Sequence, residues 1–222
     1  MPKHASPITI DYYSDVLCIW AWVAQPRLDE LHRQWRDAVT VHHRYVDIFG
    51  DCRQKIPAQW GEQEGYRTFG AHVIQCAAPY AEVTVHPDVW CTTRPHSSMP
   101  AHVLLKAVAI AAGAEEAAHM ALRIRRAFFC ELEDVGNTSL LLDLADAEHI
   151  DVTEVLKALR DGRAMAALSG DLRSAAQLGL KGSPTWVLNE GRQVLFGNVG
   201  YRILSANIEE LLKHPGAEAS WC

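Results

Sequence analysis

The stretch from Thr9 to Trp22 constrains the fold of this chain more than any other segment. An apolar run at its start predicts a short β-strand, which Ser14 and Asp15 then interrupt, and both residue types favour turns and helix caps. From Cys18 onward the apolar residues recur with helical rather than strand spacing. We therefore expect Cys18 at a strand-to-helix junction, in the first turn of the helix.

This position of Cys18 predicts a reactive thiol. The unpaired N–H groups and the positive dipole end of a helix stabilise a thiolate, so we expect the pKa of Cys18 to lie below the ~8.5 of free cysteine. The alternative is that Cys18 is a small buried hydrophobic residue, as most free cysteines are. This stretch alone leaves both interpretations open.

A second motif lies near the other end of the chain. Gly182-Ser183-Pro184-Thr185 precedes an apolar run at 186–188, and a turn at 189–192 leads to a second apolar run at 194–196. This pattern predicts a β-hairpin whose first strand begins just after a proline, a position where proline is tolerated. Because an X-Pro bond in a tight turn can be cis, we predict a cis bond between Ser183 and Pro184.

Between the two motifs the sequence predicts one strand and several helices. Residues 39–46 are expected to form a strand parallel to the first, because a helix connects the two. Residues 47–60 contain Gly50, Asp51 and Pro57, and we expect them to be irregular. The expected helices cover about 66–80, 98–112, 115–131, 163–178 and 201–213, with two more that begin near 138 and 151.

Together the strand–Cys18–helix segment and the Gly182–Thr185 hairpin resemble the thioredoxin superfamily. Ser14–Ala21 is similar to the active-site segment of the DsbA-like group, which includes FrnE-type oxidoreductases, kappa-class glutathione transferases and 2-hydroxychromene-2-carboxylate isomerases. The resemblance implies an α/β, thioredoxin-like fold with an inserted all-helical subdomain. The implied division is a thioredoxin-like domain in 1–60 and 180–213, a helical subdomain in 61–179 and a C-terminal tail in 214–222.

The chain departs from the patterns of both branches of this group. Dithiol members carry Cys-x-x-Cys, whereas this chain has Cys18-Ile19-Trp20-Ala21, and Ala21 cannot resolve a mixed disulfide. Isomerase and kappa-class members place a serine where Cys18 stands and use glutathione as the thiol. This sequence therefore falls between the two patterns.

The resemblance also implies a substrate-binding surface around Cys18. The backbone of Ser183, before Pro184 and Thr185 in the cis-proline loop, is expected to pair with an extended peptide or with glutathione. Trp20 is expected to form one wall of a groove, with Trp22 in the core, or both rings belong to the core. Near the last helix, kappa-class and isomerase members carry an acidic residue that holds the γ-glutamyl group of glutathione. In this region the present chain has Asn198, which is expected to hydrogen-bond a ligand but supplies no negative charge.

The chain ends in Cys222, which is a candidate resolving thiol because Ala21 removes the usual one. The tail from His214 has an extended reach of ~30 Å, which is long enough to approach Cys18. The alternative is a frayed terminus with an incidental cysteine. The sequence leaves this choice open.

Three functions of different classes remain as hypotheses. The first is a DsbA-like thiol-disulfide oxidoreductase that forms a mixed disulfide at Cys18. The second is a glutathione-dependent isomerase or transferase, and the third is a non-catalytic thioredoxin-like domain that binds a partner. We expect no tightly bound cofactor, with glutathione as a co-substrate in the first two, and a protein or small-molecule thiol or disulfide as the partner. The sequence does not predict an oligomeric state.

Composition excludes several other classes of protein. A net charge of −6 argues against a nucleic-acid-binding protein, and no apolar run approaches the ~18 residues of a membrane span. The first residues are polar and resemble no secretory signal, so we expect a cytoplasmic protein whose six cysteines are reduced. The cysteines are scattered without zinc-site spacing, and we therefore expect no structural metal site.

Overall fold

The computed structural model describes residues 7–214 and residue 216, and a four-stranded mixed sheet forms its centre. The strand order is β2-β1-β3-β4, in which β1 and β2 are parallel and the other neighbours are antiparallel. The strands are β1 (Ile8–Ser14), β2 (Val39–Tyr45), β3 (Thr185–Leu188) and β4 (Gln193–Phe196). The predicted parallel pair and the predicted hairpin are therefore both present.

Strand β1 lies between β2 and β3, and most of its residues are buried there. Ile10 and Tyr12 are completely inaccessible to solvent, and Tyr12 pairs across the strands with Trp186 of β3. The ring centroids of Tyr12 and Trp186 lie 4.4 Å apart. This central strand leads directly into the loop that contains Cys18.

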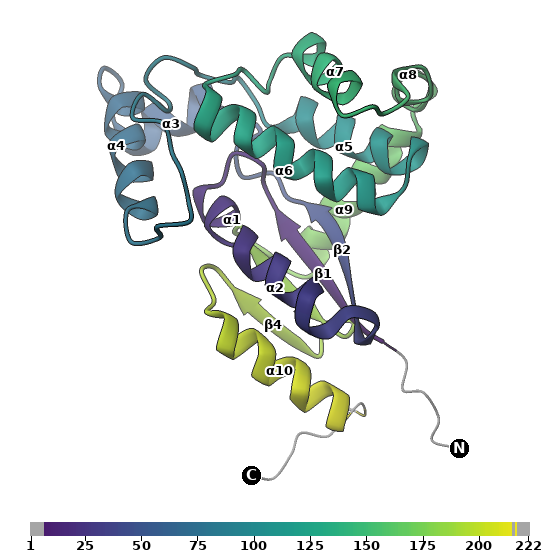
Figure 1. The fold of residues 1–222 in the computed structure, drawn as a ribbon. Helices are drawn as coiled ribbons and strands as arrows, with labels where there is room; N and C mark the ends of the chain where they lie inside the picture. Colours follow the sequence, from purple (N-terminus) through teal and green to yellow (C-terminus); the bar gives the residue numbers. More distant parts are fainter. Residues whose placement is uncertain (1–6, 215, 217–222) are drawn as a thin grey trace.

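Helices cover both faces of the sheet (Figure 1). Helices α2 (Gln25–Trp35) and α10 (Tyr201–Lys213) cover one face, to which they contribute buried leucine and isoleucine side chains. Helix α9 (Arg163–Gln177) contacts the other face, where Ala175 packs with Tyr13 and Val187. The short helix α1 (Ile19–Val23) precedes α2, and Pro26 stands in the first turn of α2, where the missing N–H has no cost.

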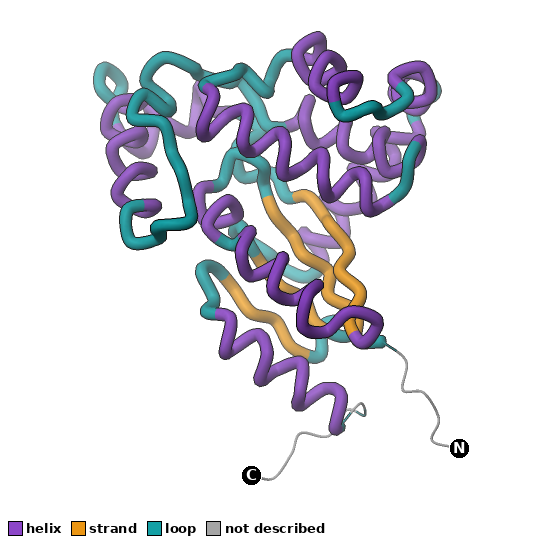
Figure 2. Tube along the Cα trace, in the orientation of Figure 1, coloured by secondary structure: helices purple, strands orange, loops and turns teal. Residues whose placement is uncertain are grey.

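The remaining helices lie beyond the C-terminal ends of β1 and β2 (Figures 1 and 2). These helices are α3 (Cys52–Trp60), α4 (Gly65–Ala77), α5 (Met99–Ala111), α6 (Ala114–Glu131), α7 (Thr138–Ala147) and α8 (Val152–Arg160). Helix α5 lies at their centre and packs against α6, α7, α8 and α9. None of the described helices is both apolar and long enough to span a bilayer.

Helix α3 corrects the expectation that residues 47–60 are irregular. The Asp51 carboxylate accepts a hydrogen bond from the Gln54 N–H at 3.0 Å and so caps the first turn. Pro57 lies inside the helix, where it removes one backbone hydrogen bond, but burial of Cys52 and Ile56 holds the segment in place. Helix α3 packs against α4 across residue 60, and the division of the chain at that residue stays a prediction.

Candidate active site

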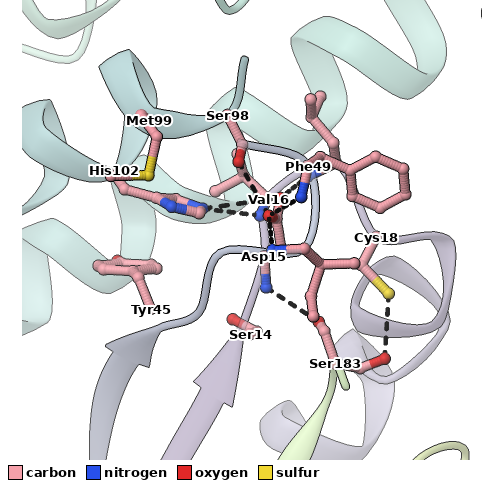
Figure 3. Close-up of polar contacts among 12 residues, drawn as sticks. Ser14, Asp15, Val16, Cys18, Tyr45, Phe49, Ser98, Met99, His102 and Ser183 are labelled. Atoms are coloured by element: carbon pink, nitrogen blue, oxygen red, sulfur yellow. Dashed lines mark hydrogen bonds and ion pairs between the residues drawn. The ribbon is translucent and has the colours of Figure 1, made fainter. Parts of the chain in front are cut away.

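Cys18 lies where the two sequence motifs meet (Figure 3). It is the N-cap residue of α1, and its Sγ donates a hydrogen bond to the Ser183 carbonyl oxygen at 3.1 Å. The peptide bond between Ser183 and Pro184 is cis, as the sequence predicts. Cys18 is 7% exposed, so its sulfur lies just beneath the protein surface.

Asp15 organises the loop that carries Cys18, as Figure 3 shows. Its side chain is fully buried, and one carboxylate oxygen accepts from Ser98 Oγ at 2.8 Å and from the N–H groups of Ile48 and Phe49. The other oxygen accepts from the Leu17 N–H at 3.0 Å. Asp15 thereby joins the end of β1 to the loop after β2 and to the start of α5.

The cis-proline loop is fixed by hydrogen bonds on both sides. Ser183 Oγ accepts from the Asp15 N–H at 2.9 Å, and the Pro184 carbonyl accepts from the Gly197 N–H at 2.8 Å. Thr185 is buried and donates its hydroxyl to the Gly182 carbonyl at 3.0 Å. Among the described residues the Ser183 N–H has no acceptor, and Ser183 as a whole is 8% exposed.

The predicted lowering of the Cys18 pKa is wrong in this structure. Burial raises the pKa of the Cys18 thiol and the nearby negative charge of Asp15 adds to the rise, whereas a hydrogen bond with the Ser183 side chain and backbone N–H groups at the start of α1 oppose it. The stabilising helix is only five residues long. The thiol donates to the Ser183 carbonyl, and a carbonyl oxygen accepts only from a protonated sulfur.

The two tryptophans of α1 are both half-buried. Trp22 stacks on Phe129 with ring centroids 6.1 Å apart and donates its indole N–H to the Thr84 carbonyl at 3.0 Å. Trp20 packs against the edge of the same large core. Both rings therefore pack against the core without being enclosed by it, and the division into Trp20 as groove wall and Trp22 as core residue stays a prediction.

Asn198 makes no described contact with Cys18. It instead connects the segment before α10 to the segment between α4 and α5. Its amide donates to the hydroxyl of Tyr80, which comes from the segment between α4 and α5. The Arg27 guanidinium lies 5.7 Å from the centre of the Tyr80 ring. A cavity of about 430 Å³ adjoins these residues, and its lining includes Val23, Arg27, Glu30, Tyr80, Glu82 and Tyr201.

The other described cysteines are free thiols in ordinary structural positions. Cys52 is completely buried, and burial raises its pKa to about 12. Cys76 is buried, whereas Cys91 and Cys130 are half-buried. Cys222 lies outside the described residues, so its role as a resolving thiol stays a prediction. No cluster suited to a metal ion occurs among His, Cys, Asp and Glu of the described chain.

Three of the residues around Cys18 were missed by sequence reasoning. The sequence indicates only a turn or a helix cap at Asp15, and it assigns no role at this site to Ser98 or His102. Ser98 does precede α5, but its hydroxyl donates to Asp15 instead of capping that helix. The one available signal was an acidic turn residue three positions before Cys18, since the other contacts join residues far apart in the sequence.

The fold and these paired motifs define a thioredoxin-like protein with an inserted set of helices. The family model of the DSBA-like thioredoxin domain matches residues 9–209, and the chain belongs to this family. A comparison with curated proteins gave no match.

Solved structures with the same fold are similar over nearly the whole chain. A Nitrosomonas europaea protein assigned as a disulfide isomerase is 18% identical, with a TM-score of 0.79 and coverage of 95% of this chain and 100% of that one. The cytosolic disulfide reductase DsbM from Pseudomonas aeruginosa, in a structure with GSH, is 22% identical, with a TM-score of 0.68 and coverage of 92% and 99%. A 2-hydroxychromene-2-carboxylate isomerase is 15% identical, with a TM-score of 0.65 and coverage of 93% and 97%.

Proposed function

We propose that this protein is a thiol-disulfide oxidoreductase that uses Cys18 as its single active-site thiol. The observation that carries the proposal is the contact between Cys18 Sγ and the Ser183 carbonyl, with the free Ser183 N–H in the same residue. This pair of backbone groups offers a peptide or glutathione the hydrogen bonds of an added strand. The sulfur of a bound disulfide would then lie beside Cys18.

The proposed reaction proceeds through a mixed disulfide. Cys18 loses its proton, the thiolate attacks one sulfur of the substrate disulfide, and the other substrate sulfur leaves as a thiolate that takes up a proton. Because Ala21 offers no second thiol, an external thiol such as glutathione attacks the Cys18 disulfide and releases the bound substrate sulfur. A second glutathione then frees Cys18, so that one substrate disulfide is reduced and one glutathione disulfide is formed.

The raised pKa of Cys18 shapes this proposal. A protonated, nearly buried thiol reacts slowly with small molecules in solution, because only the thiolate is nucleophilic. A substrate that binds at Ser183 replaces the hydrogen bond between the thiol and the carbonyl. Reaction at Cys18 would then depend on a bound substrate, which favours selective over general thiol exchange.

A glutathione-dependent isomerase or transferase is the second candidate function. Arg27 and Tyr80, the partner of Asn198, line one cavity together with Glu30 and Glu82, and a guanidinium binds carboxylates such as those of glutathione. We also keep the non-catalytic partner-binding domain as an alternative. A cytosolic disulfide reductase is among the structural relatives, and we propose a reducing, cytoplasmic location for this chain as well.

The substitution Cys18→Ser tests these alternatives. We expect the wild-type protein to reduce a glutathione mixed disulfide in the presence of glutathione, and Cys18→Ser to lose this activity by at least tenfold. Cys52→Ser serves as the matched control, since Cys52 is a buried thiol with no proposed role. Intact mass after incubation with oxidised glutathione should show one adduct, which maps to Cys18.

Retention of full activity by Cys18→Ser would exclude the thiol mechanism and favour the isomerase or transferase. Absence of both turnover and adduct in the wild type would favour the binding domain.

A further inference from the structure

His102 reaches from the helical part of the molecule into the loop that carries Cys18. It lies on α5 and is completely buried, and its Nε2 accepts a hydrogen bond from the Val16 N–H at 3.2 Å. Its ring stacks on Tyr45 with centroids 4.8 Å apart. Figure 3 shows this ring facing the turn between β1 and α1.

The hydrogen bond to Val16 determines where His102 carries its proton. A ring nitrogen that accepts a hydrogen bond has no proton, so in the neutral ring the proton must be on Nδ1. Nδ1 is buried and has no hydrogen-bond partner among the described residues. An unpaired buried donor costs free energy, so this arrangement calls for a reason why the other nitrogen must remain an acceptor.

Asp15 is the acidic group nearest to His102, and other donors already hydrogen-bond to its carboxylate. The distance from Asp15 Oδ1 to His102 Nε2 is 3.7 Å, and the carboxylate already accepts four other hydrogen bonds. A proton on Nε2 would take away the acceptor of the Val16 N–H and would place a new donor 3.7 Å from Oδ1. Protonation would therefore disturb the turn immediately before Cys18.

The charged groups around His102 come from every element packed on it. Asp15 lies in the loop after β1, Asp47 after β2, Arg125 on α6 and Asp171 on α9. Lys106 lies on the same helix, with its ammonium over the ring of Tyr45. Burial lowers the pKa of His102 despite the neighbouring carboxylates, which agrees with an uncharged ring near neutral pH.

We propose that His102 is the positioning residue of Cys18, and that it acts as a neutral acceptor for the Val16 N–H. Val16 is fully buried, so without this acceptor its N–H has no access to water and the turn must change. The same turn holds Cys18 through the bond from the Cys18 N–H to the Asp15 carbonyl at 3.1 Å. The proposal rests on the function proposed for Cys18, because it concerns the geometry of that thiol.

Two substitutions separate positioning from packing. His102→Gln places an amide oxygen near the position of Nε2 and keeps the acceptor, whereas His102→Phe keeps a flat ring against Tyr45 and removes it. We expect the pH profile of Cys18 alkylation by iodoacetamide, followed by peptide mapping, to shift in His102→Phe and to stay near wild type in His102→Gln. Turnover of the mixed disulfide should fall at least tenfold in His102→Phe and less than threefold in His102→Gln.

Val108→Ala is the control for lost stability, because Val108 is a buried residue of the same helix with an apolar side chain. It should lower the melting temperature without moving the alkylation profile. An unchanged profile in His102→Phe, or equal shifts in both His102 variants, overturns the proposal. If the wild type shows no turnover but the alkylation profiles of the variants still differ, the proposed function is wrong and the positioning role of His102 stands.

Nitrogen NMR of the wild-type protein gives a test that needs no variant to fold. We expect the His102 resonances of a neutral ring with the proton on Nδ1 from pH 6 to pH 9. A ring with its proton on Nε2, or a charged ring in this range, contradicts the proposed acceptor role.

Discussion

The reaction proposed for Cys18 requires a substrate to reach its sulfur, yet Cys18 is nearly buried. Local reasoning from the sequence placed it correctly at the start of a helix but predicted the wrong direction for its pKa. The missing information was non-local: the burial of the loop and the charge of Asp15 both raise the pKa of Cys18. A turn sequence contains no signal for either effect, because both depend on how α4, α5 and the segment after β2 pack around the loop and α1.

Cys52 provides a prediction about the pH dependence of stability. Burial raises its folded pKa to about 12, above the unfolded value of ~8.5. Below pH ~8.5 both states keep the proton and the stabilisation is complete, but above it the unfolded thiol ionises while the folded one does not. The free energy of unfolding should then fall by about 1.4 kcal/mol per pH unit for this thiol until about pH 12.

Urea unfolding of the wild type and of Cys52→Ala between pH 7.5 and 10 measures this effect. The variant should be less stable at pH 7.5, because it leaves a cavity, but should lose less stability as the pH rises. Burial of Cys18 acts in the same direction, so some slope remains in the variant. Parallel curves for the two proteins are the result that contradicts the prediction.

At the scale of elements, strands and amphipathic helices were predictable because their signals are local. The β3–β4 hairpin follows from two apolar runs around a turn, and α10 has the bounds expected from its spacing. Helix α3 was missed because Gly50, Asp51 and Pro57 all favour loops in isolation. Burial of one helical face outweighed those local preferences, which no short window of sequence could show.

The capping contact of Asp51 makes the unexpected helix α3 testable. Asp51→Ala should lower the free energy of unfolding by about 0.5–2 kcal/mol, because the N–H of Gln54 loses its acceptor. Asp51→Asn is the matched control and should be near wild type, since asparagine caps about as well. Chemical denaturation measures both. Equal losses in the two variants, or no loss in either, would show that Asp51 does not cap this helix.

At the scale of the whole molecule, a set of polar groups, all buried except the half-buried Arg44, joins the sheet to the inserted helices. We call this set the polar junction; it comprises Ser14, Asp15, Arg44, Ser98, Lys106, Arg125 and Asp171. Within it the buried Asp171 carboxylate lies between Arg44 and Lys106 and also accepts from the Tyr45 N–H at 3.0 Å. These contacts connect the C-terminal end of β2 to α5 and α9. The two parts of the chain should therefore unfold together.

Arg125 and Asp171 occupy the polar junction with opposite energetic expectations. Asp171 is the common partner of Arg44, Lys106 and a backbone N–H, and Arg44 keeps a second carboxylate partner in Asp11. Asp171→Ala therefore leaves the nearly buried Lys106 ammonium without its carboxylate and should cost about 3–5 kcal/mol. Arg125 is 1% exposed and donates to Ser14 Oγ at 2.9 Å, but within the described part of the chain it has no carboxylate partner and its Nε is unpaired. A buried cation of this kind pays the cost of leaving water without full compensation.

Arg125→Met should therefore leave the free energy of unfolding unchanged or raise it by up to about 4 kcal/mol, because methionine fills a similar volume with apolar atoms.

Denaturant unfolding followed by tryptophan fluorescence and by circular dichroism compares the two variants with the wild type. Both signals should change in one transition in the wild type, since the polar junction couples the sheet to the helices. If Arg125→Met loses as much stability as Asp171→Ala, the guanidinium has a compensating partner and the junction is a fully paired network. Two separate transitions in the wild type would instead show that the sheet and the helices are stable independently, and that the buried contacts position Cys18 without joining the two parts into one cooperative unit.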